Sequence, residues 1–282
     1  MGLRINTNTA SLNAQRNLMG TKLGLDKSLE RLSSGYRINR AGDDAAGLAI
    51  SENLRAQIRG LKQASRNASD GVSLVQVAEG SLNEISSILI RLRELSVQAA
   101  SDTIGPVERQ FLNVEYDQLV SEVDRIADGT EFNGTLLLSG TGAILDFQVG
   151  TRNDPHIDRL SFDASKADAN SAALGVNLTS VADKASAQNS LSAIDSAIVS
   201  VSAMRADFGA IQNRLQSTVS NIQVGVENMA AANSRIRDVD VAEETSEMTR
   251  NNILLQAGTS VLAQANQQSN VALGLLNKSF QG

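Results

Sequence analysis

Hydrophobic residues recur at intervals of three, four and seven along most of the chain. The first such run comprises Leu18, Leu25, Leu29 and Leu32. A much longer run comprises Leu54, Ile58, Leu61, Ala68, Val72, Val75, Leu82, Ile85, Leu89 and Leu92. This spacing is typical of a helix that buries one seam against other helices. The sequence therefore predicts a long helix that ends near Ser101-Asp102 and Gly105-Pro106.

A shorter helical pattern follows, and after it the residues become β-prone. Residues 107–128 predict a helix that stops near Asp128-Gly129. Two β-prone runs, Thr135 to Leu138 and Ile144 to Val149, then flank a Gly-rich segment. Two such runs around a turn predict a β-hairpin.

A third short strand is predicted at Leu160 to Phe162, after a turn at Asp154-Pro155. The residues that follow are mostly Ala, Ser, Asp and Asn, and they contain too few apolar positions to predict an element. We interpret this stretch as variable surface structure.

Helical spacing returns in the last third of the chain. The first set comprises Leu191, Ile194, Ile198, Val201, Phe208, Ile211, Leu215, Val219, Ile222, Val226 and Met229. The last set comprises Val241, Met248, Leu255, Leu262, Leu273 and Leu276. Two chain ends that both carry seams most simply pair with each other in antiparallel orientation. We therefore predict a mainly α fold, an elongated antiparallel helical bundle or coiled-coil rod, with a small β-hairpin insertion in the middle.

The predicted plan has three parts. Terminal helical arms comprise residues 1–42 and 238–282, and a helical rod comprises residues 43–135 and 187–237. Residues 136–186 form the hairpin and a short variable surface region.

The amino-acid composition is consistent with helices that pack along narrow apolar seams. Only 3% of the residues are aromatic, there is no Trp, and the 282-residue chain has two prolines. The first 70 residues carry 11 Lys and Arg against 6 Asp and Glu, although the whole chain has a net charge of -6. We interpret this asymmetry as solvated helix faces, because no aromatic residues interleave with the basic ones as nucleic-acid binding would favour. No apolar window is long enough to predict membrane insertion, and the start of the chain lacks the apolar stretch of a signal peptide.

The two arms contain too few large aliphatic residues for their length to fold alone. Residues 256–268 are also rich in small and amide side chains, which permit close helix packing. We expect both arms to be largely disordered in the monomer and to fold when they pack among neighbouring copies. The residues expected to make these assembly contacts are Leu18, Leu25, Leu29, Leu32, Leu255, Leu262, Leu273 and Leu276.

Residues for catalysis or metal binding are scarce. The chain has no Cys, and His156, its single histidine, follows Pro155 in a predicted turn. Asp43 and Asp44 follow Gly42, which predicts a helix end at the glycine and a helix cap at one of the aspartates. We predict no catalytic site, no cofactor and no metal.

Two long motifs resemble one known family. They are LERLSSGYRINRAGDDAAGLAI at residues 29–50 and NNILLQAGTSVLAQANQ at residues 251–267. Both are similar to the terminal signatures of bacterial flagellin, and with the intervening helices the resemblance covers roughly residues 1–135 and 187–282. It implies a structural subunit of the flagellar filament, secreted through a type III export apparatus and assembled as a homopolymer outside the cell.

The resemblance implies further partners. They are an export chaperone at the C-terminal arm, the filament cap and hook-junction proteins, and the Toll-like receptor with which animals sense flagellin. The receptor motif matches Arg91-Leu92-Arg93-Glu94-Leu95, and Arg91, Leu95 and Glu115 are the implied contacts. The same three residues are equally interpreted as part of the rod surface and its seams.

Three other classes of protein remain as alternatives. A hook–filament junction protein shares the terminal features, although both signatures match flagellin closely. A coiled-coil adhesin or chaperone would also show long seams. A cell-wall hydrolase carried in the insertion would need more than one histidine in a chain without cysteine.

Overall fold

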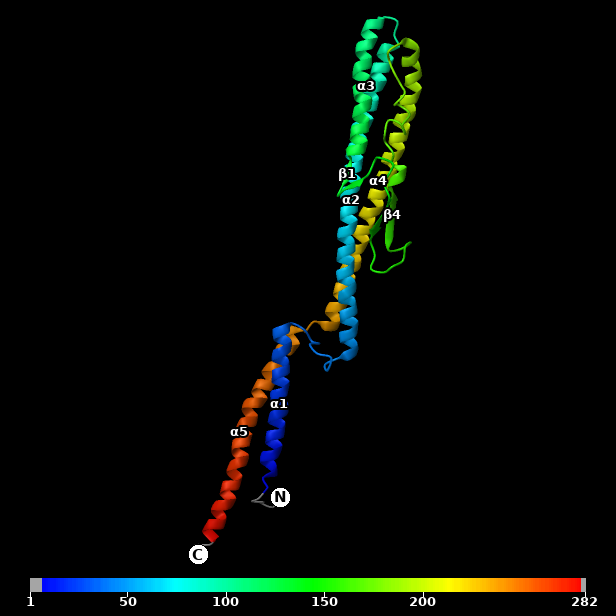
Figure 1. Ribbon diagram of the computed structural model, residues 1–282. Helices are drawn as coiled ribbons and strands as arrows, with labels where there is room; N and C mark the ends of the chain where they lie inside the picture. The colour runs from blue at the N-terminus through cyan, green and yellow to red at the C-terminus, as the bar shows by residue number, and fades with distance from the viewer. Residues whose placement is uncertain (1–6, 280–282) are drawn as a thin grey trace. The chain divides into compact units, whose positions relative to one another are not determined.

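The computed structural model describes residues 7–279, with side-chain surroundings described as far as residue 267. Helices dominate it, as predicted (Figure 1). The elements in chain order are α1 (Thr9–Ser34), α2 (Ala45–Ala99), α3 (Pro106–Gly129), β1 (Glu131–Phe132), β2 (Thr135–Leu136), β3 (Ile144–Gln148), β4 (Arg159–Asp163), the short 3-10 helix η1 (Ala164–Lys166), α4 (Lys184–Arg237) and α5 (Val241–Ser279). The chain divides into two compact units, which we call unit 1 (residues 1–56 and 229–282) and unit 2 (residues 57–228).

In unit 1, α1 and α5 pack side by side in antiparallel orientation (Figure 1). We call this pair of helices the α1–α5 hairpin, although the two helices come from opposite ends of the chain. At one end the side-chain amide of Asn8 donates to the carbonyl of Ala265 at 2.8 Å. At the other end Arg31 Nη1 lies 3.2 Å from Glu244 Oε2. The predicted antiparallel pairing of the chain ends is therefore confirmed.

Gly258 allows the two helices of this hairpin to approach closely. A Cβ atom at Gly258 would lie 3.2 Å from Cγ of Leu18, closer than most such contacts. The small residues predicted to favour close packing in this part of α5 therefore include one that faces α1.

Both ends of α1 follow from local chemistry. The side chain of Asn8 accepts a hydrogen bond from the amide of Ser11 at 3.0 Å, which caps the helix start. Gly35 ends the helix in the left-handed conformation, with φ 74°, and its amide donates to the carbonyl of Arg31. The prediction that Gly42 ends this helix is wrong, because Gly35 takes the terminating conformation seven residues earlier.

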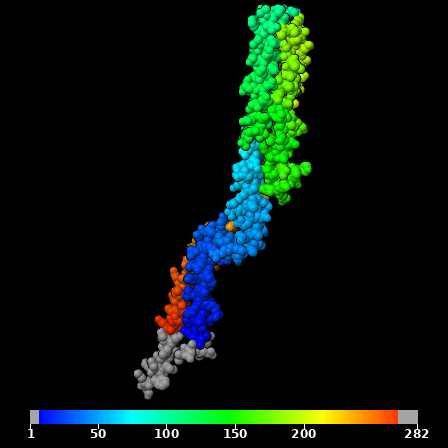
Figure 2. Space-filling view, viewed as in Figure 1, coloured from blue at the N-terminus to red at the C-terminus, as the bar shows by residue number. Residues whose placement is uncertain are grey.

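Unit 2 packs α2, α3 and α4 around one hydrophobic core, which also takes in residues of the central segment. In the upper part of Figure 2 the surfaces of α3 (green) and of the start of α4 (yellow-green) lie side by side. Its largest fully buried side chains are Tyr116, Phe208, Leu82, Ile85, Leu89, Leu92, Leu95, Leu137, Leu138, Ile194 and Leu215. Several of these belong to the seams predicted in α2 and α4.

The strands of unit 2 differ in part from the prediction. Asn133 (φ 51°) and Gly134 (φ 79°) form a two-residue turn, so β2 pairs back onto β1. The predicted pairing of residues 135–138 with β3 is therefore wrong. Instead β3 pairs antiparallel with β4, from Ile144 opposite Asp163 to Gln148 opposite Arg159. The third short strand predicted at residues 160–162 is confirmed as part of β4.

Candidate assembly surface

The outward face of the α1–α5 hairpin carries exposed aliphatic side chains. On α1 the exposed fractions are 52% for Leu12, 69% for Met19 and 63% for Leu23. These residues are spaced by seven and four, so they lie on one helix face. We call them the outer stripe of α1. Aliphatic residues gathered on one exposed face are typical of an interaction surface.

A similar set lies on α5. Ile253 is 61% exposed, Leu254 50% and Val261 54%. We call these three residues the outer stripe of α5. A pair of helices can cover only one face of each, so both stripes stay uncovered among the residues of unit 1 whose side chains are described.

The leucines predicted to drive assembly have mixed positions. Those that are half-buried are Leu18, Leu25, Leu32, Leu255 and Leu262. Leu29 is 49% exposed. Leu273 and Leu276 lie outside the residues whose side chains are described. The assembly role of all eight stays a prediction.

The two outer stripes are not among the predicted assembly residues. On α1 the spacing of seven and four from Leu12 to Met19 and Leu23 indicates a second apolar face beside the seam of leucines. A helix with two apolar faces was the available signal, and it indicates more than one packing partner.

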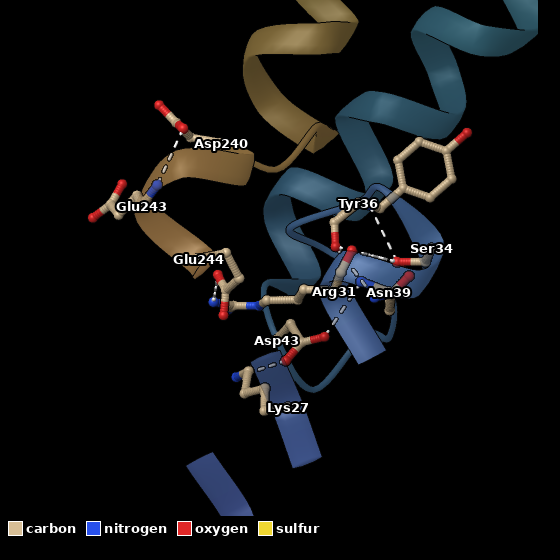
Figure 3. A network of polar contacts seen from close by, with 9 residues as sticks. All are labelled: Lys27, Arg31, Ser34, Tyr36, Asn39, Asp43, Asp240, Glu243 and Glu244. Carbon is tan, nitrogen blue, oxygen red and sulfur yellow. Dashed lines mark hydrogen bonds and ion pairs between the residues drawn. The ribbon is translucent and has the colours of Figure 1, made fainter. Parts of the chain in front are cut away.

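Charged residues join α1, α5 and the loop after α1 at the other end of the hairpin. Figure 3 shows this network, which lies within unit 1. Arg31 reaches across to Glu244 of α5, whose side chain is only 11% exposed. Lys27 Nζ lies 2.8 Å from Asp43 Oδ1. The two pairs therefore fix the loop and α5 against the same segment of α1.

Asp43 also organises the loop itself. Its Oδ2 accepts hydrogen bonds from the amides of Asn39 and Arg40 at 3.3 and 3.2 Å. The hydrogen bond from Lys27, with help from these two amides, lowers the pKa of Asp43 from 3.8 to about 2. Asp44 has the capping role that was predicted for one of the two aspartates, since its Oδ1 accepts from the amide of Gly47 at 2.8 Å.

The lowered pKa predicts acid sensitivity of this network. A carboxylate whose pKa is lower in the folded state contributes stability above its unfolded pKa, and this stability is lost as pH falls through the folded pKa. Asp43 should therefore stop stabilising the network as pH falls from about 4 to about 2. In the assembled protein, carbon NMR of Asp43 should titrate near pH 2. Lys27→Ala should move that titration upward; an unchanged value would contradict the assigned cause.

Arg237 ties the end of α4 to two other segments of unit 1. Its guanidinium lies 4.6 Å from the ring centroid of Tyr36, a cation–π geometry. The same group lies 2.5 Å from Glu52 of α2. Nearby, the amide of Arg37 donates to the carbonyl of Arg237 at 2.7 Å. Three segments separated in sequence therefore meet at this point: the loop after α1, α2 and the end of α4.

The three residues implied in receptor recognition lie in unit 2. Arg91 of α2 contacts Glu115 of α3 through Nη2 at 2.8 Å, and both side chains are about half exposed. Leu95 lies one helical turn from Arg91, but its side chain is fully buried in the core. Arg91 and Glu115 thus form one surface feature, whereas Leu95 belongs to the hydrophobic core.

The described residues show neither a metal site nor a membrane-spanning helix. Within the described residues, no three His, Asp or Glu side chains gather in a way that could hold a metal ion. Among residues 7–279, no helix contains a stretch long and apolar enough to cross a membrane. His156 is exposed in the turn that joins β3 to β4.

The chain is similar to known proteins over nearly its whole length. Residues 5–143 match the family model described as bacterial flagellin N-terminal helical region, and residues 191–276 match the bacterial flagellin C-terminal helical region. A flagellin from Halalkalibacterium halodurans is 50% identical over 273 residues, which cover 96% of this chain and 99% of that protein. A flagellar filament 33 kDa core protein from Treponema phagedenis is 45% identical over 288 residues, covering 96% and 99%.

A solved structure agrees with this. The crystal structure of Bacillus cereus flagellin matches with a TM-score of 0.50 and 34% identity, over 60% of this chain and 94% of that one. The two terminal signatures, at residues 29–50 and 251–267, lie inside the residues that match the two family models. The chain therefore belongs to the bacterial flagellin family.

Proposed function

We propose that this chain is a structural subunit that self-assembles into the bacterial flagellar filament and so serves cell motility. The relatives that it matches over almost their full length are flagellins and a flagellar filament core protein. The structural observation that supports this role is the pair of outer stripes on α1 and α5. These stripes have no partner within the described part of unit 1, and neighbouring copies would cover them.

Folding of the terminal arms is coupled to this assembly in our proposal. A two-helix hairpin buries little apolar area for each residue that it orders, and long isolated helices gain most of their stability from tertiary packing. Neighbouring subunits would supply the missing packing through the outer stripes. The charged network around Arg31 and Asp43 would then form as the arms order in the polymer.

Seeded polymerisation tests the proposal. Purified full-length protein is mixed with short filament fragments, and light scattering is followed beside a copy that lacks residues 1–42. Full-length protein should elongate the seeds, and the truncated copy should not. Failure of the full-length protein to elongate, with its arms already resistant to protease in the monomer, would overturn the proposal.

The location and partners follow from the same role. We propose that the chain is secreted through a flagellar type III apparatus and resides in the extracellular filament. An export chaperone would cover the C-terminal arm, whose exposed Ile253, Leu254 and Val261 offer an apolar surface before assembly. Cap and hook-junction proteins would contact the ends of the polymer.

A second candidate function is recognition by the Toll-like receptor for flagellin. It is favoured by the Arg91–Glu115 pair, which presents a fixed charge arrangement at the surface of unit 2. Leu95 would contribute from the hydrophobic core.

Arg91→Ala should weaken binding of the monomer to the receptor's ectodomain by about tenfold, because interface arginines are frequent hot spots. Arg125→Ala is the control: Arg125 lies on α3 outside the receptor motif, its side chain is 71% exposed, and it pairs with Glu122. Surface ion pairs contribute little stability, so both variants should unfold like the parent. Equal receptor affinity of the two variants, measured by surface plasmon resonance, would remove Arg91 from the site.

A further inference from the structure

A surface cleft in unit 2 lies between the β3–β4 turn and one face of α4. Its volume is about 470 Å³. Figure 1 shows β4 running beside α4 in this region. The residues that line the cleft are Val149, His156, Ile157, Arg159, Leu160, Asn213, Arg214, Ser217, Thr218 and Asn221. This cleft takes no part in the α1–α5 hairpin or in the Arg91–Glu115 surface.

The ionisable side chains that line the cleft are all basic ones. They are Arg159, Arg214 and His156, and no Asp or Glu shares the lining. The chain as a whole has a net charge of -6, so the two arginines make this cleft differ in charge from the average of the chain. Such a cleft favours a ligand with an oxyanion.

Within the described residues, no neighbouring carboxylate forms an ion pair with Arg159 or Arg214. In the β3–β4 turn, Asp154 accepts from the amide of His156 at 2.9 Å, and Asp158 accepts from the amide of Asp154 at 3.1 Å. Both carboxylates therefore support the turn's backbone. Asp163 and Asp207 border a neighbouring hollow together with Arg214, but within the described residues neither forms an ion pair with it.

The two arginines differ in how many of their guanidinium N–H donors form hydrogen bonds. Arg159 Nη2 donates to Asn153 Oδ1 at 2.5 Å, which leaves its other donors available. The guanidinium of Arg214 has no side-chain partner in the part of the chain that the structure describes. A planar guanidinium with free donors can bind a carboxylate, sulfate or phosphate through two parallel hydrogen bonds.

The rest of the lining suits a polyhydroxylated molecule. Asn213, Ser217 and Asn221 are spaced by four residues along α4, which places their polar groups on one helix face over roughly 12 Å. Amide and hydroxyl groups both donate and accept, as sugar hydroxyls require. Val149 and Leu160 add apolar surface, against which the C–H face of a sugar ring can pack.

We propose that this cleft binds an acidic carbohydrate. The oxyanion of the sugar binds Arg159 and Arg214, the hydroxyls bind the amide and hydroxyl ladder of α4, and a ring packs on Val149 and Leu160. The site would give the protein a glycan-binding capacity in addition to its structural role. It does not depend on polymerisation, because all of its residues belong to unit 2.

Calorimetric titration of the full-length monomer tests this proposal with three probes: lactose 3′-sulfate, lactose and inorganic sulfate. The sulfated sugar should bind at least tenfold more tightly than either of the other two. Equal affinity for sulfate alone would overturn the carbohydrate assignment, and equal affinity for lactose would overturn the anion assignment. No binding of any probe at millimolar concentration would overturn the site.

Two variants test whether the sulfated sugar binds in the cleft. Arg214→Gln should weaken binding of the sulfated sugar about tenfold, since it removes one charged donor while the helix stays intact. Arg205→Gln is the control, because Arg205 also lies on α4 but outside the cleft. An equal effect of both substitutions, or none from Arg214→Gln, would contradict the assignment.

Discussion

Met19→Asp combined with Leu23→Asp should block polymerisation of the otherwise intact chain. Both side chains are more than 60% exposed on the outer stripe of α1, so the change costs unit 1 little internal packing. In a polymer the same side chains would be buried against neighbours. Losing about 1.5 kcal/mol of apolar burial at each position already weakens assembly by more than a hundredfold, and burying two charges adds to that.

The critical concentration for seeded growth measures this effect. The double variant should show no growth at concentrations a hundredfold above the critical concentration of the parent protein. Lys22→Asn, an exposed polar position on the same helix, is the control and should assemble like the parent. Normal assembly of the double variant would mean that the outer stripe of α1 is not an intersubunit surface.

Phe208→Ala should destabilise unit 2 by about 3–5 kcal/mol, a large fraction of the stability of an ordinary domain. The Phe208 side chain is 1% exposed, and its ring centroid lies 4.8 Å from that of Phe162 on β4. The substitution leaves a cavity and removes the ring pair that joins α4 to the β3–β4 sheet.

Urea unfolding followed by circular dichroism measures this change. Phe111→Ala is the matched control, because Phe111 of α3 is 71% exposed. Its removal should change the free energy of unfolding by less than about 0.5 kcal/mol. A similar loss in the two variants would contradict the placement of the core in unit 2.

The helices of this fold could be predicted from the sequence because their seams are long and uninterrupted. Leu82, Ile85, Leu89 and Leu92 are all fully buried, and they were all in the predicted seam. Leu95 continues the same three-four spacing and is buried as well. Its implied role as a receptor contact came from a motif, whereas its spacing already indicated a core position.

The strand pairing and the end of α1 depend on single turn residues, which the hydrophobic pattern does not resolve. Residues 135–138 and 144–149 look like a hairpin because both runs are β-prone, and such runs can pair with more than one partner. The turn at Asn133-Gly134 decides the outcome, since both residues adopt positive φ. The same property of Gly35, and not of Gly42, terminates α1.

The charged network shows a different limit of prediction from the sequence. Arg31 and Glu244 are 213 residues apart, and nothing in the local sequence of either indicates the other. Their pairing follows only from the register of α1 against α5. Sequence patterns predicted that the two arms pair, whereas the partners of individual charges required the structure.

Hydrogen exchange of α1 and α5, measured on the dilute monomer and on the polymer, tests the coupling of folding to assembly most directly. Amides of both helices should exchange almost as fast as in an unfolded chain when the protein is monomeric, and they should become strongly protected in the polymer. Strong protection of α1 and α5 already in the dilute monomer would contradict it.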